Sequence, residues 1–173
     1  MPPTARDALI AIAALLAPDE PGVADQVAHA HHDPNAYLQA HADRLDERGI
    51  DEPIPNLAWI ALIDALTDRG LLAEVDWKEP AEEIIAQLRG LRSSPSRPEA
   101  WAWGDHTDTD RPTYDFLELA GDTLRSAGTA LAVLDIESDC YPLVLLPAVR
   151  ASELVDLATT AGFTAHVLAA PRE

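Results

Sequence analysis

Apolar side chains recur at helical spacing along the first 127 residues of the chain. Positions three and four apart share one face of a helix, so this spacing predicts amphipathic helices. Proline and glycine separate the apolar segments and indicate turns between them. The expected helices cover residues 4–17, 23–32, 33–49, 56–70, 80–92 and 112–127.

Two of these helices carry further signals. In the first, Thr4 and Asp7 have the spacing of a capping box, although Glu or Gln is the usual partner of the capping residue. The helix over residues 56–70 is apolar almost all round, which is typical of a buried helix. We expect it to begin at Asn56, to end at Gly70 and to form the buried centre of a helical layer.

The helix expected over residues 33–49 has one narrow apolar stripe. Its charged residues lie on the other faces of the helix, and we expect them to face water. The stripe consists of Leu38, Ala42 and Leu45, and the residues expected to face water are Asp43, Asp46, Glu47 and Arg48.

The periodicity of the chain changes at Gly128. Residues 129–136 are apolar on both faces of a pleated strand, which is typical of a central strand. Further strands are expected at 141–146 and 164–169, with a helix over 152–161 between them. A tight turn at 138–140 would pair the first two strands as a hairpin, and Pro142 would place the second strand near an edge or mark its start.

These strands predict a small antiparallel or mixed sheet of three or four strands. The third strand is expected beside the first, in the order 2-1-3, and residues 71–77 form either a short edge strand or an extended connector. The expected fold class is α+β, in a single domain over residues 1–173. A helical layer over 1–127 would pack on a β-hairpin-α-β unit over 128–170.

The charge of the chain excludes several classes of function. Asp and Glu number 30 against 12 Lys and Arg, which gives a net charge of -18 over 173 residues. Nucleic-acid binding needs a basic surface, so it is not expected here. No apolar run approaches the roughly 20 residues of a membrane span. A single cysteine excludes an intrachain disulfide framework, and we expect a cytoplasmic protein.

Two segments resemble a known family. One runs from Leu57 to the Asp-Trp-Lys-Glu block at 76–79, and the other is the acidic stretch Asp-Ile-Glu-Ser-Asp at 135–139 with its flanking strands. Over roughly residues 56–168 the chain resembles a bacterial family known only as a domain of unknown function. The resemblance implies a bacterial origin and an α+β fold, and it implies no activity, cofactor or catalytic residue.

Acidic residues at the hairpin form the leading candidate site. Asp135, Glu137 and Asp139 alternate at the end of an expected strand, so their carboxylates would share one face. Asp76 and Glu79 would join them if residues 71–77 pair with the sheet. Close carboxylates serve acid–base chemistry, a divalent cation or an acidic binding edge, whereas acidic turns also occur without any function.

Other candidate groups have competing structural interpretations. The histidines near Asp33 lack a known metal-ligand spacing and suit a solvated helix face. Trp101 and Trp103 either pack onto the domain or form a binding surface. The Asp run that follows them fails the calcium-loop pattern. These groups comprise His29, His31, His32, Asp33 and His41, and Asp105, Asp108 and Asp110.

Two single residues give weak signals for chemistry. Acidic neighbours at Glu137 and Asp139 should raise the pKa of the Cys140 thiol, which argues against a reactive cysteine. Lys78 is the only lysine, and we expect it to pair with nearby carboxylates while its stem covers Trp77.

The sequence therefore favours binding over catalysis. A strongly negative field speeds encounter with a basic partner, and size and charge resemble those of immunity proteins that neutralise toxins. The expected partner-binding residues are Asp76, Glu79, Trp101, Trp103, Asp135, Glu137 and Asp139. We expect no cofactor. The alternative is a divalent-metal-dependent enzyme or metal-binding protein that uses the acidic hairpin.

Overall fold

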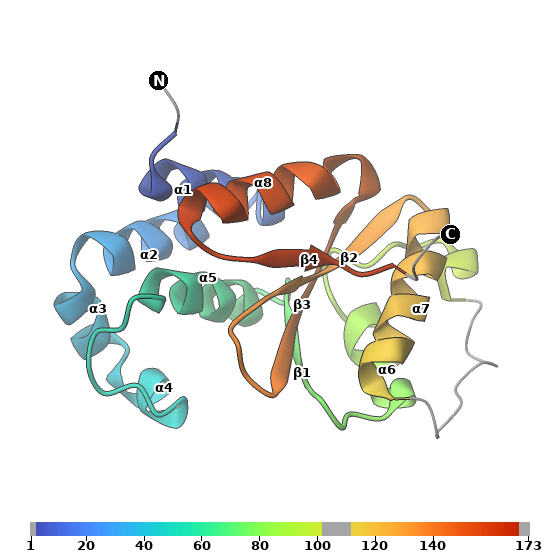
Figure 1. Cartoon of the computed structure of the whole chain (residues 1–173), viewed down its shortest axis with the longest axis horizontal. Coiled ribbons are helices and arrows are strands. Elements are labelled where there is room, and N and C mark those ends of the chain that lie inside the picture. The colour runs from blue at the N-terminus through green and yellow to red at the C-terminus, as the bar shows by residue number, and fades with distance from the viewer. Residues whose placement is uncertain (1–2, 102–111, 170–173) are drawn as a thin grey trace.

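A four-stranded antiparallel sheet lies between two groups of helices in the computed structural model, which describes residues 3–101 and 112–169 (Figure 1). The strands are β1 (Ala73–Asp76), β2 (Thr129–Leu134), β3 (Cys140–Pro147) and β4 (Ala165–Val167), in the spatial order β1-β3-β2-β4. The α+β fold class is confirmed, as is the expected 2-1-3 order of the last three strands. Residues 71–77 supply an edge strand.

Eight α-helices are described, together with short 3-10 turns at Pro98–Trp101 and Ala148–Arg150. The helices are α1 (Ala5–Leu16), α2 (Pro21–His32), α3 (Pro34–Ala40), α4 (Ala42–Glu47), α5 (Leu57–Asp68), α6 (Ala81–Arg89), α7 (Thr113–Ser126) and α8 (Ala151–Ala161). None of the described helices is long and apolar enough to cross a bilayer.

Helices cover both faces of the sheet, whereas the sequence predicted one helical layer. Helices α1, α2, α5 and α8 pack against one face, and α6 and α7 pack against the other. Successive side chains of β2 enter opposite cores: Ala132 belongs to the first and Leu131 to the second. This is why residues 129–134 are apolar at every position but the first.

Several local signals agree with the structure. The side chains of Thr4 and Asp7 form the predicted capping box at the start of α1. Helix α5 is buried nearly all round, as its composition predicted. Asn56 precedes α5 as expected, but its side chain makes no capping hydrogen bond. Gly70 follows α5 with a φ of 68°, a conformation that glycine adopts at little cost.

The helix expected over residues 33–49 is instead two helices, α3 and α4, which meet at His41. The break directs Tyr37 toward α2, where its hydroxyl accepts a hydrogen bond from Gln26 at 2.9 Å. It directs Arg48 toward α5. Arg48 was expected to face water, but it binds the buried Asp64 on α5 at 2.7 Å. A helix-face pattern does not detect such long-range ion pairs.

Two strand details also differ from expectation. The loop from β2 to β3 spans residues 135–139, so it is longer than the predicted tight turn. Pro142 is neither at the start of β3 nor on an edge strand, because β3 lies between β1 and β2. Pairing between β2 and β3 ends at Leu143, whereas pairing with β1 continues through Pro142, which lies opposite Glu74.

Helix α7 approaches the end of the chain very closely at Gly121. A Cβ atom at this position would lie 1.8 Å from the carbonyl oxygen of Leu168. Glycine inside a helix costs roughly 0.5–1 kcal/mol relative to alanine, and here no side chain fits. Gly121 therefore fixes how tightly α7 packs on the segment that follows β4.

Candidate functional site

The acidic loop and the end of β1 lie side by side at one end of the sheet. Asp76 is in register with Cys140 at the start of β3. The backbone N–H of Trp77 donates to the carbonyl of Asp139 at 2.9 Å. The Glu79 N–H donates to the carbonyl of Asp76 at 3.0 Å. The structure thus brings Asp76 and Glu79 to the acidic loop, as predicted on condition that residues 71–77 pair with the sheet.

The carboxylates of the loop do not share a strand face. Strand β2 ends at Leu134, so the alternation expected for Asp135, Glu137 and Asp139 does not apply. The Asp135 carboxylate accepts the Glu137 N–H at 2.7 Å and lies 3.4 Å from Nε2 of His166. Glu137 adopts a φ of 55°, which is uncommon for a residue with a side chain. Because of this turn, the carboxylates of Asp135, Glu137 and Asp139 have different neighbours.

Exposed aromatic side chains accompany the carboxylates. Trp77 is 49% exposed and Tyr114 is 41% exposed. The Tyr114 ring lies 5.8 Å from that of Tyr141. Trp77 directly follows β1 and its backbone N–H bonds to Asp139, whereas Tyr141 lies on the face of β3 that carries α6 and α7. We call Asp76, Trp77, Tyr114, Asp139 and Tyr141 the acidic–aromatic surface; the sequence reasoning missed its aromatic part.

The side chains of this surface have charged neighbours. Partial burial raises the pKa of Tyr114, and the nearby Glu118, Tyr141 and Asp135 raise it further. The Lys78 ammonium lies 4.6 Å from the centre of the Trp77 ring. Lys78 therefore covers Trp77 as predicted. The expected pairing with nearby carboxylates is wrong, because no ion pair among the described residues includes Lys78.

Trp101 lies away from the acidic–aromatic surface. It is half-buried, its indole N–H donates to the Pro95 carbonyl at 3.0 Å, and Arg89 lies 5.7 Å from its ring. Arg89 ends α6, whereas Trp77 precedes α6, so the two tryptophans lie toward opposite ends of this helix. Trp103 and the calcium candidates at 105–110 lie outside the described residues.

In the histidine group, His29 and His41 contact Tyr37 and Asp33 caps a helix, while His31 and His32 are exposed. Asp33 accepts the Ala36 N–H at 3.1 Å and so caps α3. The His41 ring stacks on Tyr37 at 4.2 Å, and the His29 ring meets the edge of Tyr37 at 5.7 Å. Across residues 3–101 and 112–169, no three His, Cys, Asp or Glu side chains gather closely enough to hold a metal ion.

Cys140 is the free thiol beside the acidic loop. Burial raises the pKa of this thiol, and the carboxylates of Glu74 and Asp76 raise it further, while Arg48 opposes them. The predicted direction is confirmed, although Glu74 and Asp76 contribute in place of Glu137.

We therefore expect Cys140 to react slowly with a neutral alkylating reagent. A raised pKa leaves a smaller thiolate fraction at pH 8, and the thiolate is the nucleophile. Iodoacetamide alkylation, followed by mass spectrometry from pH 7 to pH 10, should give a higher midpoint for the folded protein than for the protein in urea. Equal midpoints would show that the fold does not affect the thiol.

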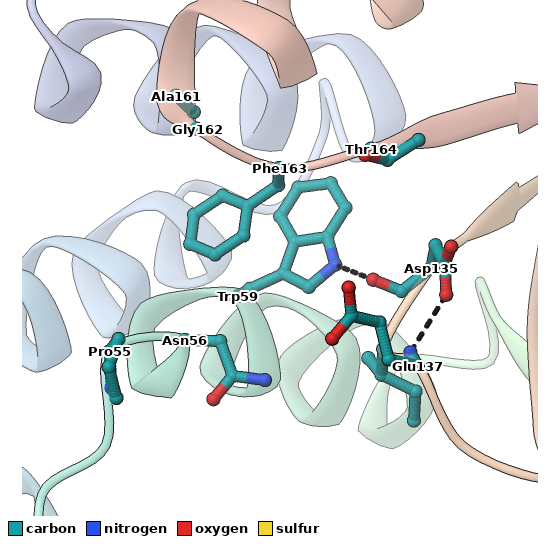
Figure 2. Close-up of a pocket in the computed structure, with 10 residues that line it drawn as sticks. Pro55, Asn56, Trp59, Asp135, Glu137, Ala161, Gly162, Phe163 and Thr164 are labelled. Carbon is teal, nitrogen blue, oxygen red and sulfur yellow. Dashed lines mark hydrogen bonds between the residues drawn. The ribbon is translucent and has the colours of Figure 1, made fainter.

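A pocket of about 500 Å³ opens on the other side of the acidic loop. Residues from three segments line it: Pro55, Asn56 and Trp59, then Asp135, Ile136 and Glu137, then Ala161, Gly162, Phe163 and Thr164. The indole of Trp59 stacks on Phe163 at 4.8 Å and donates to the Asp135 carbonyl at 2.9 Å. Figure 2 shows the Glu137 carboxylate turned toward the wall formed by Trp59 and Asn56.

Sequence comparison places this architecture in a family. The profile of a family described as domain of unknown function (DUF6630) matches residues 8–169. The match includes most of residues 1–55, which the resemblance noted from the sequence did not cover. Comparison with curated proteins and with solved structures finds no match. The chain belongs to the family described as domain of unknown function (DUF6630).

Proposed function

We propose that this protein binds a basic protein partner through the acidic–aromatic surface. The observation that carries the proposal is the exposure of Trp77 and Tyr114 beside the carboxylates of Asp76 and Asp139. Tryptophan and tyrosine are enriched among the residues that dominate binding energy at interfaces. The specific form that we propose is an immunity-type protein that acts in the cytoplasm and neutralises a basic toxin.

Charge supports a basic partner. The net charge of -18 produces a negative field around the molecule. Several acidic side chains elsewhere are neutralised by arginine, among them Asp64, Glu74 and Glu20. Asp76 and Asp139, in contrast, form no ion pair with any described residue. Their charges remain available to a partner.

The proposal predicts that the charged residues control the association rate, whereas the aromatic residues control the dissociation rate. Asp76→Lys with Asp139→Lys should slow association, because charges at the rim of an interface act mainly through steering. The effect should shrink as salt rises, since the Debye length falls from about 10 Å at 0.1 M to about 3 Å at 1 M. Trp77→Ala should instead speed dissociation by about tenfold or more.

The experiment begins with affinity capture from the native host and continues with binding kinetics at two salt concentrations. The matched control is Asp25→Lys with Asp156→Lys, which makes the same charge change at exposed positions on α2 and α8. If both pairs of substitutions slow association equally, the change in association rate depends on net charge and not on the acidic–aromatic surface. Association that ignores charge reversal and salt would contradict the proposal. A metal-dependent turnover of a metabolite, with a divalent-ion rise in Tm, would favour the metal alternative.

A further inference from the structure

We propose that the pocket lined by Trp59, Glu137 and Phe163 binds a guanidinium group, which the basic partner supplies as an arginine side chain. This inference rests on the proposed function and deepens it, because it assigns one partner side chain to one pocket. The pocket adjoins the acidic–aromatic surface through the loop at 135–139, so one partner can reach both.

The pocket has room for an arginine side chain. Its volume of about 500 Å³ falls within the range of small-ligand sites. The stacked rings of Trp59 and Phe163 form an aromatic wall, with 8° between their planes. Trp59 is wholly buried and Phe163 is half-buried, so Phe163 presents the accessible part of this wall.

Two polar side chains of the pocket, Glu137 and Asn56, have no hydrogen-bond or ion-pair partner among the described residues. The Glu137 carboxylate accepts no hydrogen bond and forms no ion pair with any described residue, and Figure 2 shows it directed into the pocket. The Asn56 side chain lies at the start of α5 but does not cap it. A carboxylate acceptor therefore stands unpaired at the cavity, which suits a ligand with several N–H donors.

The electrostatics of the pocket favour a cation. Helix α5 begins at the pocket and contributes roughly half a positive charge, while α8 ends there and contributes roughly half a negative charge. These two contributions oppose each other. The Glu137 carboxylate adds a full negative charge, and the Asp135 carboxylate adds a second one that is shared with His166 at 3.4 Å.

The same wall discriminates between the two cationic side chains. Guanidinium is planar, stacks on aromatic faces and binds a carboxylate through two parallel hydrogen bonds. An ammonium group is a compact, strongly hydrated charge and gains less from an aromatic wall. A pocket lined by both the Glu137 carboxylate and the Phe163 ring thus matches arginine better than lysine.

The test uses the full chain with three small probes: N-acetyl-arginine amide, N-acetyl-lysine amide and N-acetyl-citrulline amide, which is the neutral analogue of the first. Binding is followed by the NMR shift of the Trp59 indole N–H, which donates to the Asp135 carbonyl. The Trp77 indole on the acidic–aromatic surface serves as the internal control for cations that collect on an acidic protein. The variants are Glu137→Gln and the matched control Asp25→Asn, which removes one exposed carboxylate of α2 outside the pocket lining.

We expect the arginine probe to shift the Trp59 signal saturably, with about tenfold weaker binding to Glu137→Gln and unchanged binding to Asp25→Asn. The citrulline probe should produce no saturable shift. Equal binding of arginine and citrulline, equal binding of arginine and lysine, or no effect of Glu137→Gln would overturn the assignment of a guanidinium pocket.

Partner kinetics separate this inference from the proposed function. Glu137→Gln should raise the dissociation rate of the captured partner by about tenfold, and a partner peptide with its arginine replaced by citrulline should show the same loss. If the partner dissociates from Glu137→Gln at the parent rate while Asp76→Lys with Asp139→Lys still slows association, the pocket assignment is wrong and the proposed function stands. If the arginine probe binds as expected but no basic partner is captured, the proposed function fails and the partner clause falls with it.

Discussion

Replacing Arg48 with methionine should lower the free energy of unfolding by about 3–5 kcal/mol. Arg48 donates to Asp64 at 2.7 Å and to Glu74 at 2.8 Å, and so joins α4, α5 and β1. Asp64 is only 2% exposed. Methionine retains the apolar stem but leaves the buried Asp64 carboxylate with Arg44, at 3.4 Å, as its one cationic partner among the described residues.

Urea denaturation is the appropriate measurement, because a guanidinium salt would itself screen ion pairs. The matched control is Arg150→Met, which removes an exposed arginine paired with Glu153 at 3.0 Å and should cost less than about 1 kcal/mol. Adding Asp64→Asn to Arg48→Met should restore part of the loss, since it removes the uncompensated charge. Equal losses for Arg48→Met and Arg150→Met would show that burial of Asp64 contributes nothing.

Local patterns predicted the elements that tertiary packing does not override. Residues 129–134 are apolar on both pleat faces because the two cores meet at β2, and the sequence showed this directly. Helix α5 was apolar all round and proved to be buried. In both segments, the positions of the apolar side chains within one element are sufficient to predict which of its faces are buried.

Long-range placement could not be predicted in the same way. The stripe of α6, with Ile84 and Leu88 buried, identifies which helix face is buried but not which face of the sheet it covers. Arg48 occupies a polar helix face, and its partners lie 16 and 26 residues further along the chain. No local spacing encodes such pairs.

One part of the candidate site could be predicted from the sequence, and the other part could not. The proximity of Asp76 to the acidic loop followed from a strand pairing that the sequence suggested. The pocket could not be predicted from strand pairing, because its aromatic residues Trp59 and Phe163 come from α5 and from the turn after α8. The turn at Glu137, with its positive φ, also replaces the strand alternation on which a shared carboxylate face depended.

The second large effect is expected at Trp59. Trp59→Ala should lower the free energy of unfolding by about 3–5 kcal/mol, because the side chain is wholly buried and its removal leaves a cavity. Trp59→Phe keeps an aromatic ring against Phe163 but removes the donor to the Asp135 carbonyl. It should cost less than the alanine variant, with about 1 kcal/mol from the lost hydrogen bond. Urea denaturation of the two variants and the parent measures both differences.

The two Trp59 variants also separate the core from the acidic loop. The Asp135 carbonyl is the atom through which Trp59 holds the loop, and the next link is the 2.7 Å hydrogen bond from the Glu137 N–H to the Asp135 carboxylate. Trp59→Phe should therefore speed amide hydrogen exchange at Glu137 while amides in the centre of α5 keep their parent protection relative to global stability. Exchange that changes uniformly across α5 and the loop would mean that the indole hydrogen bond stabilises the whole fold equally. A local change would mean that a buried core residue fixes the geometry of the carboxylate that faces the pocket.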